Sequence, residues 1–88
     1  MCEIDRRIGA LLRSRRKTKN LTQKETAKRA GINIRHYQLF EGCGRSLITA
    51  SFTTTMAVLT ALDIEPYSFI ESYVKVYEEP NAPGGEHL

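Results

Sequence analysis

The sequence predicts an all-α fold of five helices joined by short connections. Apolar residues recur at spacings of three and four along most of the chain, as they do on one face of an amphipathic helix. Residues that favour helix N-termini, such as Thr22 and Ser51, precede several of these segments. Asn20 and Gly31 tolerate the left-handed backbone conformation, so each marks a predicted helix end. A chain of 88 residues fits one domain, which we place at 1–79.

The first predicted helix runs from Glu3 to Lys19. One stripe along it is largely apolar and consists of Ile4, Ile8, Leu11, Leu12 and Arg15. The opposite side is basic, with Arg6, Arg13, Arg16 and Lys17. This division predicts one buried and one solvated face.

The second predicted helix covers 23–30. Thr22 and Glu25 form a capping-box pattern, in which the hydroxyl and the carboxylate each accept a backbone N–H. Asn33 caps the third helix only two residues after Gly31. Two short helices joined by such a turn meet at a steep angle, which is the helix-turn-helix geometry.

The third predicted helix ends at Glu41, and its Tyr37 and Phe40 face inward. Residues 42–50 are predicted as a loop. Ser51 caps the fourth helix, whose apolar positions are Phe52, Met56, Leu59 and Leu62. Proline favours the first helical position, so Pro66 begins the last helix, which extends to Glu78. The segment 80–88 is predicted as a flexible tail.

Charge is divided unevenly along the chain. Residues 1–45 hold twelve Lys and Arg against four acids, a balance of +8, whereas 46–88 hold one Lys against six acids, a balance of −5. This asymmetry is typical of a basic half that meets a polyanion. Cys2 and Cys43 lack the spacing of a zinc site, so we expect free thiols, no metal and no cofactor. The sequence lacks a signal peptide and a membrane-spanning run, so we expect a cytoplasmic protein without a membrane partner.

Four segments resemble the Cro/CI-type family of helix-turn-helix DNA-binding proteins, the phage-repressor-like or XRE family. They read IGALLRSRR at 8–16, LTQKETAKRAGIN at 21–33, YQLFEG at 37–42 and VLTALDIEPYSFI at 58–70. The resemblance implies a five-helix, lambda-repressor-like bundle. It also implies sequence-specific binding of double-stranded DNA by a transcriptional regulator, a repressor in most such proteins. Arg15 and Thr55 stand where the family commonly has apolar residues, which predicts a looser core.

The resemblance implies that the third helix reads bases in the major groove. The predicted base-reading residues are Asn33, Ile34, Arg35, His36, Gln38 and Leu39. The predicted phosphate-binding residues are Thr22, Gln23, Lys24, Arg16, Lys19 and Arg45. In similar proteins the glutamine at Gln23 also braces the recognition helix, and a structural salt bridge joins Arg16 to Glu41. Each exposed polar residue has the alternative of a phosphate contact or plain solvation, and Ile34 and Leu39 have that of packing.

The last helix carries more apolar surface than a small core covers, which predicts a homodimer on a palindromic operator. The expected interface is Tyr67, Ile70, Tyr73, Val74 and Tyr77, with completion of the monomer core as the alternative. No catalytic set of residues is recognisable, so we expect neither an enzyme nor a small-molecule ligand. An alternative function is a protein-interaction or antitoxin-like module with weak or no specific DNA binding. RNA binding is a further alternative, although no aromatic stacking surface supports it.

Overall fold

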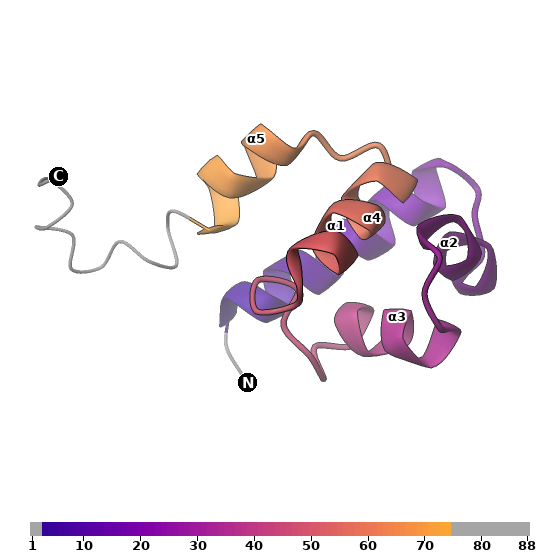
Figure 1. Ribbon diagram of the computed structural model, residues 1–88. Helices are drawn as coiled ribbons and strands as arrows, with labels where there is room; N and C mark the ends of the chain where they lie inside the picture. Colours follow the sequence, from indigo (N-terminus) through magenta and orange to yellow (C-terminus); the bar gives the residue numbers. More distant parts are fainter. Residues whose placement is uncertain (1–2, 75–88) are drawn as a thin grey trace, which may run out of the picture.

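The computed structural model describes residues 3–74, and this part of the chain is helical without strands. Figure 1 shows the arrangement of its helices. Their bounds are α1 Glu3–Thr18, α2 Gln23–Ala30, α3 Ile34–Glu41, α4 Phe52–Ala61 and α5 Pro66–Phe69, followed by a π-helical turn η1 at Ile70–Val74. The all-α prediction is confirmed for these residues. The predicted tail at 80–88 lies outside them, as do Cys2 and Tyr77.

The predicted signals at the ends of α2 are present. Thr22 Oγ1 accepts the backbone N–H of Glu25 at 3.0 Å, and the Glu25 carboxylate accepts that of Thr22 at 2.8 Å, which completes the capping box. Gly31 ends the helix with φ 71°, and Asn20 after α1 has φ 61°. These left-handed residues turn the chain sharply without strain at glycine and with little at asparagine.

The core lies where α1, α3 and α4 meet. Its fully buried side chains include Ile8, Leu12, Tyr37, Phe40, Val58, Leu59 and Leu62. α1 packs against α3, and α2 packs against both α3 and α4. In Figure 1, α3 and α5 lie at opposite sides of the fold, so the surface of α3 is separate from that of the C-terminal helix.

The predicted loop at 42–50 is an irregular segment that also contributes to the core. Leu47 is only 1% exposed, and its carbonyl accepts a hydrogen bond from Thr55 Oγ1 at 2.9 Å. Arg15 likewise donates to the carbonyls of Leu62 and Asp63. Arg15 and Thr55 therefore join neighbouring segments through hydrogen bonds to their backbone.

Pro66 begins the last helix, as predicted, but its α-helical geometry ends at Phe69 and a π-helical turn follows to Val74, while the predicted end at Glu78 lies outside the described residues. A π turn has a longer repeat than an α turn, so residues four and five positions after Phe69 share its side of the helix. Tyr73 stacks on Phe69 with ring centroids 5.4 Å apart, and Val74 also packs against the core. Both residues were expected in a dimer interface, with completion of the monomer core as the alternative, and in this chain both are partly buried against the core.

No helix within residues 3–74 combines the length and the apolar character needed to cross a membrane. Over the same residues, no cluster of three His, Cys, Asp or Glu side chains is arranged to hold a metal ion.

Candidate functional site

The outer face of α3 is exposed and carries both polar and apolar side chains. Asn33, Arg35 and Gln38 are exposed, and the apolar Ile34 and Leu39 are each 38% exposed. Asn33 is the N-cap, and its Oδ1 accepts the backbone N–H of Arg35 at 2.7 Å. Tyr37 and Phe40 fill the core, as predicted, and so fix which side of α3 faces outward.

The predicted base-reading residues lie together on the surface of α3. His36 is less exposed than the others. This side chain is half-buried, and its ring lies against Phe40 with centroids 4.9 Å apart. Arg45 reaches it from the 42–50 segment, with Nη1 3.4 Å from His36 Nε2. A shallow hollow on this face is lined by Asn33, Arg35, His36, Leu39 and Arg45. Arg35 and Arg45 both line the hollow, and their positive charges make this face attractive to anions.

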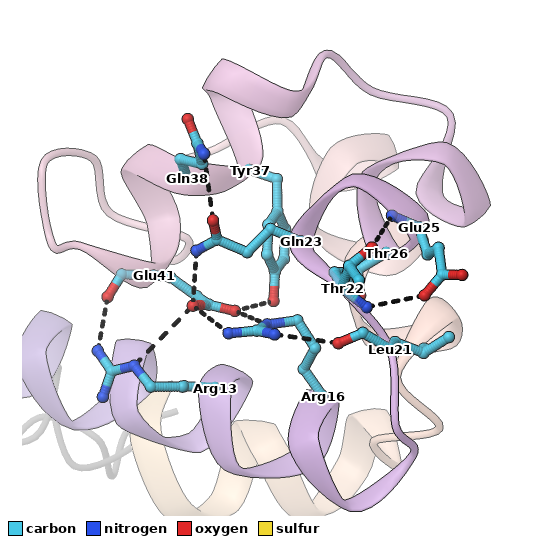
Figure 2. A network of polar contacts seen from close by, with 10 residues as sticks. All are labelled: Arg13, Arg16, Leu21, Thr22, Gln23, Glu25, Thr26, Tyr37, Gln38 and Glu41. Atoms are coloured by element: carbon cyan, nitrogen blue, oxygen red, sulfur yellow. Dashed lines mark hydrogen bonds and ion pairs between the residues drawn. The ribbon is translucent and has the colours of Figure 1, made fainter.

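A buried carboxylate holds α3 from behind. Glu41 is 3% exposed, and Figure 2 shows the side chains that surround it. Arg16 Nε donates to Oε2 at 2.6 Å and Nη2 to Oε1 at 3.3 Å. The Tyr37 hydroxyl donates to Oε2 at 2.6 Å. Gln23 Nε2 donates to Oε1 at 3.0 Å. A buried charge is tolerated only when it is paired and hydrogen-bonded, and Glu41 meets both conditions.

These contacts perturb the ionisation of the groups involved. Burial by itself raises the pKa of Glu41, but the hydrogen bonds from Arg16, Tyr37 and Gln23 outweigh burial and leave that pKa below its usual value. The hydrogen bond with Glu41 raises the pKa of Arg16. Burial and the hydrogen bond to Glu41 raise the pKa of Tyr37. The carboxylate is therefore charged at neutral pH while the hydroxyl keeps its proton.

The Arg16–Glu41 ion pair expected from the resemblance is present. Arg16 also donates to the carbonyl of Leu21 at 3.0 Å, and only 13% of its side chain is exposed. Its predicted contact with phosphate therefore competes with three hydrogen bonds inside the protein. Arg16 serves mainly to join α1, the start of α2 and α3.

The remaining predicted phosphate-binding residues differ in whether their side chains are exposed or already bonded to other groups of the protein. Lys24 and Arg45 are exposed, whereas the Thr22 hydroxyl is used in the helix cap. The amide of Gln23 contacts both Glu41 and Gln38, which leaves one of its N–H groups unused. Lys19 forms an ion pair with Asp63 at the turn after α4, so its charge is locally neutralised. Lys19 is thus a link between α1 and that turn.

Sequence reasoning missed two residues behind α3. A Cβ built on Gly9 would lie 2.5 Å from the Glu41 carbonyl oxygen, so α1 and α3 touch backbone to backbone. A glycine inside an apolar helical pattern is a signal for such close approach. Arg13 is on the exposed side of α1, as predicted, and its Nη2 also donates to the same carbonyl at 3.4 Å. No sequence pattern indicates that contact.

Comparison with known proteins does not place the chain in a family. No protein-family model, no curated protein and no solved structure matches it. The site offers an exposed helix that carries hydrogen-bonding side chains, flanking positive charge and a hydrogen-bonded support behind the helix, which together suit recognition of a polar, anionic partner.

Proposed function

We propose that this chain is a sequence-specific double-stranded DNA-binding protein of the Cro/CI type that regulates transcription as a repressor. In this proposal α2 and α3 form a helix-turn-helix, and α3 enters the major groove. The observation that carries the proposal is the exposed outer face of α3 held from behind by the buried Glu41 network. A helix that reads base edges must be exposed and fixed in orientation, and both properties coincide here.

Individual roles follow from side-chain chemistry. Arg35 would donate two hydrogen bonds to O6 and N7 of guanine, and Gln38 would pair with adenine. Ile34 and Leu39 are exposed enough to contact thymine methyl groups. Asn33 and His36 would bind a base edge or a neighbouring phosphate.

The flanking groups would bind the DNA backbone. Lys24, Arg45 and the free N–H of Gln23 lie beside the outer face of α3 or at the start of α2. The N-terminus of a helix favours a phosphate because its backbone N–H groups are unpaired and its dipole is positive there. These contacts would supply affinity without sequence preference.

A second copy of the chain would pair through the apolar side of the molecule. Tyr67 is 71% exposed and Ile70 is 41% exposed, which supports the part of the predicted interface that remains at the surface. Phe52, 78% exposed, borders the same region, where an apolar groove runs between α4, α5 and the 42–50 segment. A twofold dimer would set two α3 helices about 34 Å apart, one turn of DNA.

The test is selection of bound sites from random-sequence duplex DNA. The proposal predicts enrichment of a palindromic site and an affinity that falls steeply with salt. Arg35→Ala should cost about 1–3 kcal/mol at one base pair and relax the preference there. If Arg35→Ala instead weakens binding equally for all sequences, Arg35 contacts only a phosphate. Failure to enrich any duplex would favour the protein-interaction alternative.

A further inference from the structure

Arg45 is held at both ends of its side chain on the outer face of α3. Its backbone N–H donates to the carbonyl of Leu39 at 3.3 Å, so the start of the side chain is fixed near the C-terminal end of that helix. Its guanidinium lies nearer the N-terminal end, where Nη1 is 3.4 Å from Nε2 of His36. The side chain therefore runs back along α3 and lines the shallow hollow on this face.

The ring of His36 is oriented by the aromatic residue one turn further along α3. It stacks on Phe40 with centroids 4.9 Å apart, and Phe40 is only 2% exposed. His36 is itself half-buried, whereas its neighbours Ile34 and Arg35 are exposed. Packing against a buried side chain restricts the ring to one orientation, in which Nε2 is the nitrogen that meets Arg45.

The chemistry of this contact determines the state of the histidine. A guanidinium has only donors and keeps its charge, so Nε2 of His36 must be the acceptor. A neutral imidazole accepts at one nitrogen and carries its proton on the other, which places the proton on Nδ1. A protonated ring could not accept the hydrogen bond and would repel the positive charge of Arg45. The contact therefore requires a neutral His36 in the Nδ1–H tautomer.

We infer that His36 is a positioning residue, which holds the guanidinium of Arg45 beside the hollow so that it binds one phosphate of the DNA backbone. This inference rests on the proposed function. A guanidinium has several N–H donors, so the one given to His36 leaves others for the phosphate oxygens. Because the side chain is already ordered, binding costs less conformational entropy than it would for a free arginine. His36 thus supports a phosphate contact through Arg45 and reads no base.

The experiment uses the best duplex from random-sequence selection, with its phosphates replaced one at a time by uncharged methylphosphonates. In the wild type, replacement of a bound phosphate should weaken binding. The phosphate bound by Arg45 is the one whose replacement has no effect in Arg45→Met. His36→Phe keeps a ring on Phe40 but removes the acceptor, so it should weaken binding by about 2- to 12-fold. It should also reduce the effect of the same replacement and leave the preference at every base pair unchanged.

Two further variants serve as controls. His36→Gln offers an amide oxygen in place of Nε2, so it should restore the affinity and the effect of that methylphosphonate. Arg7→Met removes an exposed arginine that lies over the ring of Tyr73, in the C-terminal part of the fold on the side away from α3 (Figure 1). It should leave the effect of the methylphosphonate as it is in the wild type. Circular dichroism checks that each variant is folded.

Three results with these variants would overturn the inference. In the first, His36→Phe changes the preference at one base pair, which would make His36 a base-reading residue. In the second, His36→Phe leaves the effect of every methylphosphonate at its wild-type value. In the third, His36→Gln binds the duplex no better than His36→Phe.

NMR of the wild type without DNA tests the contact independently of any variant. At mildly alkaline pH, Nε2 of His36 should show the nitrogen chemical shift of an unprotonated ring nitrogen, and Nδ1 that of an N–H group. The opposite tautomer would overturn the inference even if every variant failed to fold. Absence of DNA binding by a wild type that shows the Nδ1–H tautomer would instead defeat the proposed function.

Discussion

The α1–α3 side and the α4–η1 side of the molecule are stabilised by different interactions. On the first side a charged carboxylate, Glu41, is buried at 3% exposure among directional hydrogen-bond donors. On the second side Val58 and Leu59 are buried within the apolar core, while Phe52 is 78% exposed. Hydrogen bonds fix an orientation, whereas apolar burial is non-directional. The first side therefore holds α3 in one orientation, whereas the second leaves apolar surface exposed.

The largest expected effect comes from removing the buried charge. Glu41→Ala should lower the free energy of unfolding by about 3–5 kcal/mol, because Arg16 is left buried without its partner. Glu3→Ala is the matched control, since Glu3 forms an exposed ion pair with Arg6. The control should change stability by less than about 1 kcal/mol. Chemical denaturation measures both variants. If both variants lose the same free energy of unfolding, the buried ion pair does not stabilise the protein more than the exposed one.

The next effect tests the close contact between α1 and α3. Gly9→Ala should destabilise the protein by about 1–3 kcal/mol, because the new methyl group would lie 2.5 Å from a backbone oxygen of Glu41. Ser14→Ala, on the exposed face of the same helix, controls for the higher helix propensity of alanine. The thermal midpoint of Gly9→Ala should fall and that of Ser14→Ala should not. A stabilised Gly9→Ala variant would contradict the backbone contact.

A smaller effect is expected from pH. The pKa of Glu41 is lower in the folded protein, so its contribution to stability is present above the unfolded pKa and is lost as pH falls through the folded pKa. The pKa of Tyr37 is raised, so stability falls again as pH rises above the ordinary tyrosine value. Denaturation as a function of pH should show that Glu41→Gln flattens the acid limb and that Tyr37→Phe flattens the alkaline limb. If neither variant changes the dependence of stability on pH, the ionisation of Glu41 and Tyr37 does not contribute to it.

The smallest effect on folding is expected on the apolar side. Phe52→Ser removes a 78% exposed ring and should change the stability of the monomer by no more than about 0.5 kcal/mol. The same change should weaken self-association, since the ring borders the proposed dimer contact. Thr53→Ser, at the neighbouring exposed position, is the control. Sedimentation should show the wild type and Thr53→Ser as dimers and Phe52→Ser as monomer. A monomeric wild type would end the dimer proposal.

The local signals in the sequence predicted the helices well. Thr22, Glu25 and Gly31 set the bounds of α2 through contacts a few residues apart, and those contacts can be recognised without a structure. The inward direction of Tyr37 and Phe40 likewise follows from helical spacing.

The contacts that complete the site join distant segments, and the sequence does not show them. Gly9 meets Glu41, Lys19 meets Asp63 and Gln23 meets Gln38 only once the helices have packed. The π turn after Phe69 also depends on tertiary packing, because it places Tyr73 and Val74 on the core. The Arg16–Glu41 pair was expected through a family resemblance, since spacing along the chain gives no indication of it.

The most direct test of the central claim is an NMR titration of the labelled protein with its selected duplex. We expect the largest shifts on the outer face of α3 and at the start of α2, with Arg35, Gln38 and Lys24 among them. Shifts confined to the apolar surface of α4 and α5, around Phe52 and Tyr67, would contradict the claim that α3 is the part of the molecule that reads DNA.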